Sequence, residues 1–284
     1  MSELSGKVCL VTGFTQGIGK ETALGLAKKG ATLVLVARDA ARAEAAAAEV
    51  RAAAASGAAV EVLLADLSSQ ASVRKLAGEF LARHDRLDVL VNNAGAINTS
   101  RKVTVDGLEM TFAVNHLAYF LLTNLLLDAV KKAAPARIIN VSSAAHSSGR
   151  IDFEDLQGER GYAGFRAYGQ SKLANILFTR ELARRLDGTR VTANALHPGV
   201  VRTGFGRGDG GLLALGVKIA GVFFISPAQG AATTLWLASS PEVANVSGKY
   251  FAKCREKAPS RRAQDDDTAR KLWDVSAKLT GLTA

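Results

Sequence analysis

A glycine-rich turn between a buried strand and a helix constrains the fold of this chain more than any other feature. Lys7 to Thr12 is a short continuous apolar run, which is typical of a strand buried on both faces. The turn Gly13 to Gly19 follows with three glycines and opens an amphipathic helix that ends at Gly30. Glycines allow a tight turn and let backbone N–H groups approach a ligand closely. The pattern predicts a dinucleotide phosphate site at the helix N-terminus, with an ordinary glycine turn as the alternative.

Strand and helix patterns alternate along the rest of the chain without a linker or a break in composition. The further strands that we expect are 32–37, 59–65, 87–91, 137–141 and 191–196. The helices that we expect between them are 40–56, a helix capped by Ser68 and running to Ala82, 109–130 and 164–186. This alternation predicts one domain over residues 1–284, an α/β Rossmann-type doubly wound parallel sheet with helices on both faces.

Composition and charge narrow the class of protein. The chain is 48% hydrophobic, as in globular proteins, and its net charge of +10 comes from scattered basic residues without interleaved aromatics. We therefore expect no nucleic-acid partner, although the charge suits an anionic cofactor or a lipid surface. The four histidines lack metal-ligand spacing, so no metal is expected. Residues 1–6 are polar, and we expect no signal peptide or anchor, a cytoplasmic protein, and free thiols at Cys9 and Cys254.

Tyr168 and Lys172 lie one helical turn apart on the expected helix 164–186, and no other tyrosine of the chain has a lysine at that spacing. An isolated phenol titrates near pH ~10, too high for efficient proton transfer at neutral pH. A neighbouring ammonium stabilises the phenolate, so we expect Lys172 to lower the pKa of Tyr168. The spacing alone is common by chance, and a surface aromatic–lysine pair is the alternative.

The residue after the second expected strand bears on the choice of cofactor. Dinucleotide sites that prefer NAD place an acid near this position to hold the ribose hydroxyls, whereas this chain has Ala37 followed by Arg38. A guanidinium group can bind a 2′-phosphate through two hydrogen bonds. The sequence therefore predicts NADP(H), unless Arg38 merely pairs with Asp39 in solvent.

Five motifs in a fixed order resemble the short-chain dehydrogenase/reductase family over nearly the whole chain. They are Thr12-Gly13-x-x-x-Gly17-Ile18-Gly19, Asn92-Asn93-Ala94-Gly95, Ser143, Tyr168-x-x-x-Lys172 and His197-Pro198-Gly199. Segments 140–146, 168–182, 197–203, 247–251 and 269–274 resemble the retinol dehydrogenase branch more narrowly, as does the spacing of 25 positions between Ser143 and Tyr168. Members of that branch often carry an N-terminal membrane anchor, which is not expected here.

The resemblance implies four catalytic residues: Asn115, Ser143, Tyr168 and Lys172. Ser143 would hydrogen-bond the substrate carbonyl and Tyr168 would donate the proton. Lys172 would lower the pKa of Tyr168 and bind the nicotinamide ribose, while Asn115 would hold a water that links Lys172 to solvent. The residue types agree with this chemistry, because a carbonyl that accepts a hydride develops negative charge that hydroxyl donors stabilise.

The resemblance also implies a set of cofactor contacts. Asp66 would contact the adenine, Asn92 would support the central strand, and Thr203 would contact the nicotinamide end, although Asp66 and Asn92 could be ordinary turn residues. The full expected set is Gly13, Thr15, Gln16, Gly17, Ile18, Gly19, Arg38, Asp66, Leu67, Asn92, Ala94, Gly95, Tyr168, Lys172, Pro198, Gly199, Val201 and Thr203.

Two apolar segments raise the question of a membrane. The expected helix 109–130 contains Asn115, His116, Asn124 and Asp128, which favours a buried or subunit-interface helix and leaves a monomer or a homodimer open. Segment 204–225 begins with a glycine-rich part and ends in 14 mostly apolar residues, too few to span a bilayer. We expect a substrate lid there, with peripheral membrane contact left open and ordinary core or dimer surface as the alternative.

Together these features predict an oxidoreductase that depends on NADP(H). It would transfer a hydride between the nicotinamide and a small lipophilic aldehyde or alcohol of the retinal and retinol type. A ketone or steroid reductase with the same catalytic residues is one alternative. A non-catalytic protein that senses NADP is another, but such proteins tend to lose the tyrosine or the lysine, and both are present here.

Overall fold

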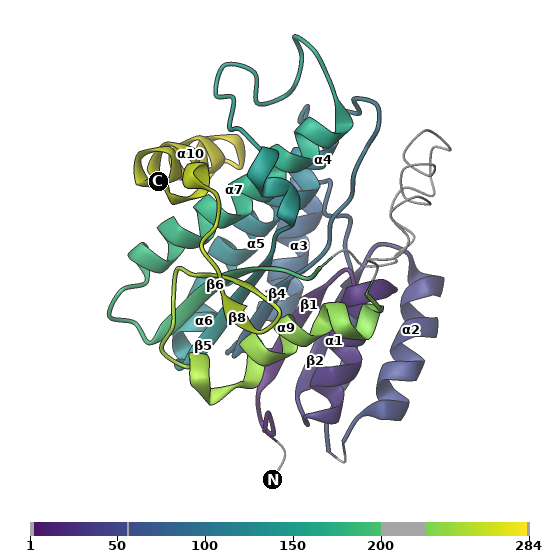
Figure 1. The fold of residues 1–284 in the computed structure, drawn as a ribbon. Coiled ribbons are helices and arrows are strands. Elements are labelled where there is room, and N and C mark those ends of the chain that lie inside the picture. The colour runs from purple at the N-terminus through teal and green to yellow at the C-terminus, as the bar shows by residue number, and fades with distance from the viewer. Residues whose placement is uncertain (1–2, 56, 200–224, 283–284) are drawn as a thin grey trace.

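An eight-stranded sheet forms the centre of the molecule in the computed structural model, which describes residues 3–55, 57–199 and 225–282 (Figure 1). Within these residues the strand order is β3-β2-β1-β4-β5-β6-β7-β8. The strands are β1 (Val8–Thr12), β2 (Thr32–Ala37), β3 (Val60–Leu64), β4 (Val89–Asn92), β5 (Ala136–Val141), β6 (Val191–His197), β7 (Tyr250–Ala252) and β8 (Arg255–Glu256). All neighbouring pairs are parallel except β7 and β8, so the expected parallel sheet carries a short antiparallel edge.

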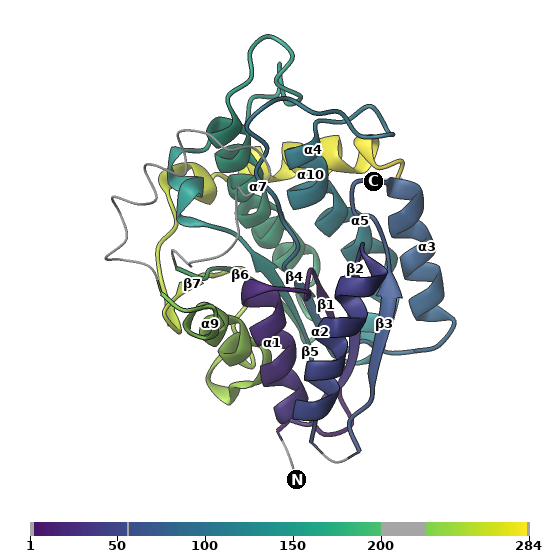
Figure 2. The same cartoon turned by 90° about the vertical axis from the view of Figure 1, so that its right-hand side faces the viewer.

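Helices cover both faces of the sheet, as the two views in Figures 1 and 2 show. One face carries α1 (Gly17–Lys28), α2 (Ala40–Ala53) and α9 (Pro227–Ser239), and the other carries α3 (Gln70–Leu81), α5 (Ala118–Leu125) and α7 (Gly164–Arg185), with α10 (Asp266–Leu279) packed on α7. The central strands are mostly apolar because both faces of the sheet are covered: Leu10 packs into one core, and Cys9 and Val11 into the other. The expected doubly wound α/β fold is confirmed.

The strand order reverses beside β1, where β2 leaves on one side and β4 on the other. Parallel strands end at the same edge of a sheet, and ligands of such folds bind outside those ends, at the point where the order reverses. The ends of β1, β4, β5 and β6 therefore bring Gly13, Ala94, Ser143 and Pro198 to one edge.

The expected helix 109–130 is present over nearly its whole length, but it is not one regular α-helix. Residues Met110–Phe112 form α4, Ala113–Leu117 form a π-helical turn, η1, and α5 and α6 (Leu127–Lys132) follow. The widened turn lets the Asn115 side chain leave the helix and bond the backbone of Ala96, at 2.8 Å to the N–H and 2.9 Å to the carbonyl. π-Helical turns often occur at functional sites.

Smaller expectations also change. The N-cap of α3 is Ser69, which accepts from the Ser72 N–H, because the Ser68 hydroxyl is bound to Asp66 at 2.8 Å. Four elements that the sequence does not predict follow the last expected strand: α9, β7, β8 and α10. Of the expected lid 204–225, residues 204–224 lie outside the described residues, as do Val201 and Thr203.

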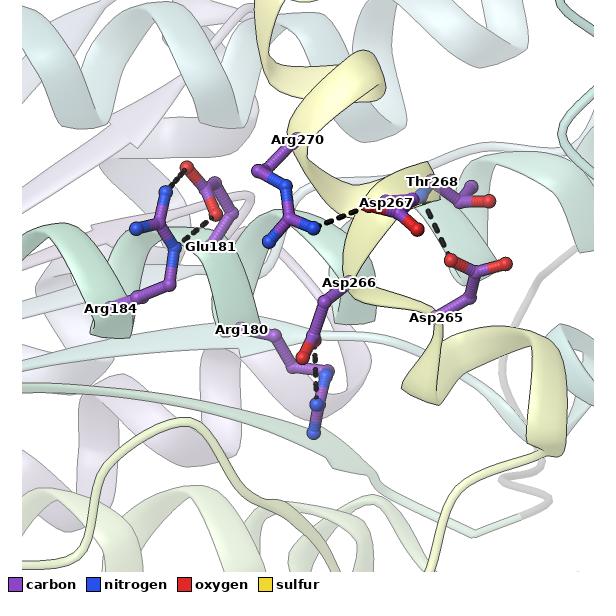
Figure 3. A network of polar contacts seen from close by, with 8 residues as sticks. All are labelled: Arg180, Glu181, Arg184, Asp265, Asp266, Asp267, Thr268 and Arg270. Carbon is purple, nitrogen blue, oxygen red and sulfur yellow. Dashed lines mark hydrogen bonds and ion pairs between the residues drawn. The ribbon is translucent and has the colours of Figure 1, made fainter.

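An ion pair joins α10 to α7 (Figure 3). Arg180 of α7 pairs with Asp266 at 2.8 Å, and Asp265 caps α10 by accepting from the Thr268 N–H. Glu181 is only 2% exposed and binds Arg184 with both carboxylate oxygens. Although burial opposes it, these hydrogen bonds hold the pKa of Glu181 below its usual range. Arg180 and Glu181 of α7 are thus both held by ion pairs.

None of the helices formed by the described residues is both long and apolar enough to cross a membrane.

Candidate active site

The glycine-rich turn has the shape of an anion cradle. Gly13 and Gly17 have φ of 73° and 57°, a region that favours glycine. A Cβ on Gly19 would lie 2.2 Å from the Gly13 oxygen, so the turn and α1 pack too closely for a side chain. Gln16 is the N-cap residue of α1, but among the described residues no side chain forms a capping hydrogen bond there. The first turn of α1 contains no acidic residue. The N–H groups at the start of α1 therefore remain available to an anion, which fits a pyrophosphate.

The turn after β4 is locked onto the glycine-rich turn. The Thr12 hydroxyl accepts from the N–H groups of Asn93 and Ala94, at 2.9 and 3.1 Å. The Asn93 amide in return donates to the carbonyls of Thr12 and Gly13. Asn92 points elsewhere: it is fully buried and donates to Asn140 and Thr123. Asn92 thus supports the sheet below the site, as expected for a strand-supporting residue, and does not line it.

The basic side chains that follow β2 lie beside the same turn, because the Gly13 N–H donates to the Val36 carbonyl. Arg38 is exposed and forms no ion pair with Asp39 among the described residues. Asp39 instead caps α2 by accepting from the Arg42 N–H. The Arg42 guanidinium donates to the Gln16 side chain at 2.8 Å, which places a second cation at the turn.

The remaining expected cofactor residues surround this turn. Thr15 and Ile18 are half-buried and Gln16 is exposed. Asp66 ends the loop after β3, where its carboxylate accepts from the Ser68 N–H and hydroxyl, and Leu67 packs at the edge of the core. Pro198 and Gly199 follow β6, and Gly199 has φ of 98°.

Lys172 lies at the centre of the catalytic group that the sequence predicts. Its side chain is 3% exposed, and its Nζ donates to the Val141 carbonyl at 3.0 Å and lies 5.6 Å from the centre of the Tyr168 ring. A Cβ on Gly95 would lie 3.2 Å from Asn115 Oδ1 and 3.4 Å from this Nζ. Asn115, Gly95 and Lys172 therefore converge, and Asn115 also donates to Ser171 Oγ at 2.9 Å.

The pKa values differ from the sequence-based expectation. Burial raises the pKa of Tyr168, and a hydrogen bond with the Ser143 side chain opposes that rise. Burial lowers the pKa of Lys172 to about 7. The expected lowering of the Tyr168 pKa by Lys172 is therefore wrong for this structure, because the same burial that surrounds the pair removes much of the lysine charge.

Ser143 stands at the end of β5, as the N-cap of the 3₁₀ helix η2 (Ala144–Ser148). Its Oγ accepts from the Ala145 N–H at 3.2 Å. A hydroxyl that accepts in this way still has its own proton to donate. Together with the hydrogen bond that connects it to Tyr168, this geometry gives two hydroxyl groups that can meet one substrate oxygen.

Two residues of this region were not singled out from the sequence. Arg42 stands four residues after Arg38, and that spacing could have indicated a second cation beside the glycine-rich turn. Tyr119 stands four residues after Asn115; its hydroxyl donates to the Ala94 carbonyl at 2.7 Å, and its ring centre is 5.9 Å from Lys172 Nζ. Burial raises the pKa of Tyr119, so it stays a phenol. Among the described residues no group of His, Cys, Asp and Glu has the arrangement of a metal site.

Comparison with known proteins shows the family of this chain. The chain matches the family model for short chain dehydrogenases over residues 7–209 and belongs to the short-chain dehydrogenase/reductase family. Within that family it falls in the retinol dehydrogenase branch. It is 47% identical to human (Homo sapiens) retinol dehydrogenase 13 over 99% of this chain and 86% of that protein. It is 48% identical to Mus musculus retinol dehydrogenase 12 over 99% of this chain and 88% of that protein.

Solved structures show the same fold. A crystal structure of an uncharacterised protein from Mycobacterium Paratuberculosis has a TM-score of 0.80 at 36% identity, covering 98% of this chain and 94% of that chain. The Pseudomonas aeruginosa RhlG/NADP active-site complex has a TM-score of 0.71 at 32% identity, covering 87% of this chain and 94% of that chain. The family makes this protein an oxidoreductase that uses a nicotinamide cofactor.

Proposed function

We propose that this protein transfers a hydride between NADP(H) and a lipophilic aldehyde or alcohol of the retinal and retinol type. The observation that carries the proposal is the meeting of Ser143, Tyr168 and Lys172 beside an uncapped, glycine-lined helix start at one edge of the sheet. The buried Tyr168–Lys172 pair also argues against a purely cofactor-sensing protein, which has no need of a buried proton donor.

The proton in this proposal comes from Tyr168. When bound, NADPH supplies the hydride to the carbonyl carbon. The substrate oxygen then gains negative charge, and the Ser143 and Tyr168 hydroxyls stabilise it by donating hydrogen bonds. The phenol gives its proton to that oxygen, and Lys172, whose pKa is about 7, can pass a proton on toward Tyr168 at neutral pH. In the direction of alcohol oxidation the same groups take the proton away.

The preference for NADP(H) rests on two guanidinium groups. Arg38 has no carboxylate partner among the described residues, and Arg42 is held against Gln16 at the start of α1. Arg38 stands next to the strand end where a dinucleotide site that selects NAD has an acid, and Arg42 follows in the first turn of α2. A 2′-phosphate would compensate their charge.

The apolar character of the substrate rests on the relatives and on one exposed side chain. The relatives reported above carry the name retinol dehydrogenase. Phe165 stands one helical turn before Tyr168 on α7 and is 56% exposed. An aromatic surface beside the proton donor suits a long hydrocarbon chain.

The test is a panel of long-chain aldehydes, retinoids and steroids followed by NADPH absorbance, with wild-type protein and Tyr168→Phe. We expect retinal-like aldehydes to give the highest kcat/KM. The variant should bind NADPH normally but lose about 10²- to 10⁴-fold in kcat, since it cannot donate the proton. Near-normal turnover by Tyr168→Phe would remove Tyr168 from the mechanism. A preference for steroids would favour the ketone or steroid reductase instead.

A further inference from the structure

Two histidines hold one peptide group at the active site. His146 Nδ1 lies 2.7 Å from the carbonyl oxygen of Ser143, and His197 Nδ1 lies 3.2 Å from the N–H of Ala144. These two backbone atoms belong to the same peptide group, the one that leads from Ser143 into η2. Both polar atoms of the peptide next to a catalytic side chain are thus bound by imidazole nitrogens. We call His146 and His197 the histidine clamp.

The hydrogen bonds determine where the proton of each imidazole sits. The Ser260 N–H donates to His146 Nε2 at 3.1 Å, so that nitrogen carries no proton and Nδ1–H donates to Ser143. His197 Nδ1 accepts from the N–H groups of Ala144 and Gly199, at 3.2 and 3.4 Å, so its proton is on Nε2. The clamp therefore requires two neutral imidazoles in opposite tautomers.

The surroundings keep both imidazoles neutral. Burial lowers the pKa of His197 to about 4, and the neighbouring His146 ring and the Lys257 ammonium further disfavour a proton there. Burial also lowers the pKa of His146, against the opposing hydrogen bond to Ser143. The Tyr250 ring packs on His146 at 4.9 Å, and no carboxylate among the described residues pairs with either imidazole. Within the part of the chain that the structure describes, no charged group therefore favours protonation of either ring near neutral pH.

We propose that His146 and His197 are positioning residues that hold Ser143 in place for catalysis, and that His146 couples the chain at Ser260 to the active site. The proposal rests on the function proposed above. Protonation would break the clamp at His197 and would separate His146 from Ser260, while the His146 bond to the Ser143 carbonyl would remain. A proton on His146 Nε2 would face the Ser260 N–H, and one on His197 Nδ1 would face the N–H groups of Ala144 and Gly199. The clamp therefore opens in acid and lowers turnover there.

The first test compares leucine and asparagine at each clamp position. Leucine removes the hydrogen bond, whereas asparagine offers an amide near the place of Nδ1 and does not titrate in this range. We expect His146→Leu and His197→Leu to lose about 10- to 100-fold in kcat, as a small misplacement of a catalytic group does, with NADPH affinity nearly unchanged. His146→Asn and His197→Asn should restore most of that loss and shift the acid limb of the kcat profile to lower pH.

A matched control is His84→Asn, which removes a histidine near Glu61, far from the clamp. It should leave both kcat and the acid limb unchanged. The positioning role would be overturned if the leucine variants kept the wild-type kcat. It would also be overturned if the asparagine variants folded but had a kcat no higher than that of the leucine variants. Circular dichroism and the melting temperature identify variants that fail to fold. If a leucine variant fails to fold, the kcat and the acid limb of the corresponding asparagine variant decide whether the histidine positions Ser143.

The second test needs no substrate. Long-range ¹H–¹⁵N spectra of protein labelled with ¹⁵N-histidine report the tautomer of each ring, with assignments from the asparagine variants. We expect His146 protonated on Nδ1 and His197 on Nε2 at about pH 7. The clamp would be overturned if both rings carried their proton on the same nitrogen, or if either ring were doubly protonated at that pH. A protein that reduces no carbonyl of the panel would contradict the proposed function, and these spectra would still show whether the clamp exists.

Discussion

Arg38 and Arg42 are the residues through which this protein would distinguish two nearly identical cofactors. NADPH differs from NADH by one phosphate, so a single guanidinium contact can account for much of the preference. Arg42 is already oriented by its bond to Gln16, whereas Arg38 is exposed and has no ion-pair partner among the described residues. The two cations stand on either side of the Asp39 cap, which keeps the only nearby carboxylate of that loop occupied with the backbone.

Arg38→Ala should weaken NADPH binding by about 10- to 150-fold, the range for one lost charged hydrogen bond, and leave NADH almost unchanged. Fluorescence titration of both cofactors measures the two dissociation constants. Arg51→Ala, at the far end of α2 and paired with Glu44, is the matched control and should change neither. An equal loss for both cofactors would show that Arg38 does not contact the phosphate.

At the scale of elements, the contact between α1 and the turn before it determines whether the phosphate cradle can form. The helix start lies so close to the Gly13 carbonyl that only glycine fits at position 19. The amide of Asn93 lies on the other side, where a Cβ on Gly19 would come within 2.5 Å of its nitrogen. One missing side chain therefore brings three elements together: β1, α1 and the turn after β4.

Gly19→Ala should lower the free energy of unfolding by about 1–3 kcal/mol, the usual cost of overpacking, and abolish tight NADPH binding. The control is Gly78→Ala in α3, where an added Cβ meets nothing within 4 Å. That change should raise stability by about 0.5–1 kcal/mol, because alanine favours the helix. Urea unfolding of both variants measures the two effects. A Gly19→Ala protein as stable as the wild type would mean that the turn can move away.

For the whole molecule, the decisive property is that the site is buried between elements that are distant in sequence. Lys172 of α7 faces Tyr119 of α5, Asn115 of η1 and the Val141 carbonyl of β5. No ion pair with Lys172 exists among the described residues, so burial alone sets its charge. The protein therefore loses stability by keeping this lysine where the reaction needs it.

This burial predicts how stability depends on pH. The pKa of Lys172 falls from 10.5 to about 7 on folding, so between these values the unfolded chain binds a proton that the folded protein does not. The free energy of unfolding therefore rises with pH across that window. Lys172→Met removes this contribution, so the free energy by which the variant is more stable than the wild type should shrink from about pH 7 to about pH 9. A constant difference in urea unfolding would contradict the lowered pKa.

The sequence by itself determined the parts of this protein that depend on local chemistry. The apolar runs and helical periods predicted β1 to β6, α1, α2, α3 and α7, with ends that shifted by only a few residues. The three glycines predicted the turn at α1, because backbone angles and missing side chains are local properties. The spacing of Tyr168 and Lys172 predicted that they share a helix face, and they do.

Only the tertiary structure decided what depends on residues distant in sequence. The Asn115 side chain in the π-helical turn bonds the Ala96 backbone, which lies in the loop after β4. The charge of Lys172 and the tautomers of the histidine clamp follow from burial and from partners such as Ser260 that are far away along the chain. Periodicity and motif spacing predict neither the pKa values nor the hydrogen-bond partners, because the packed environment sets both and sequence neighbours do not.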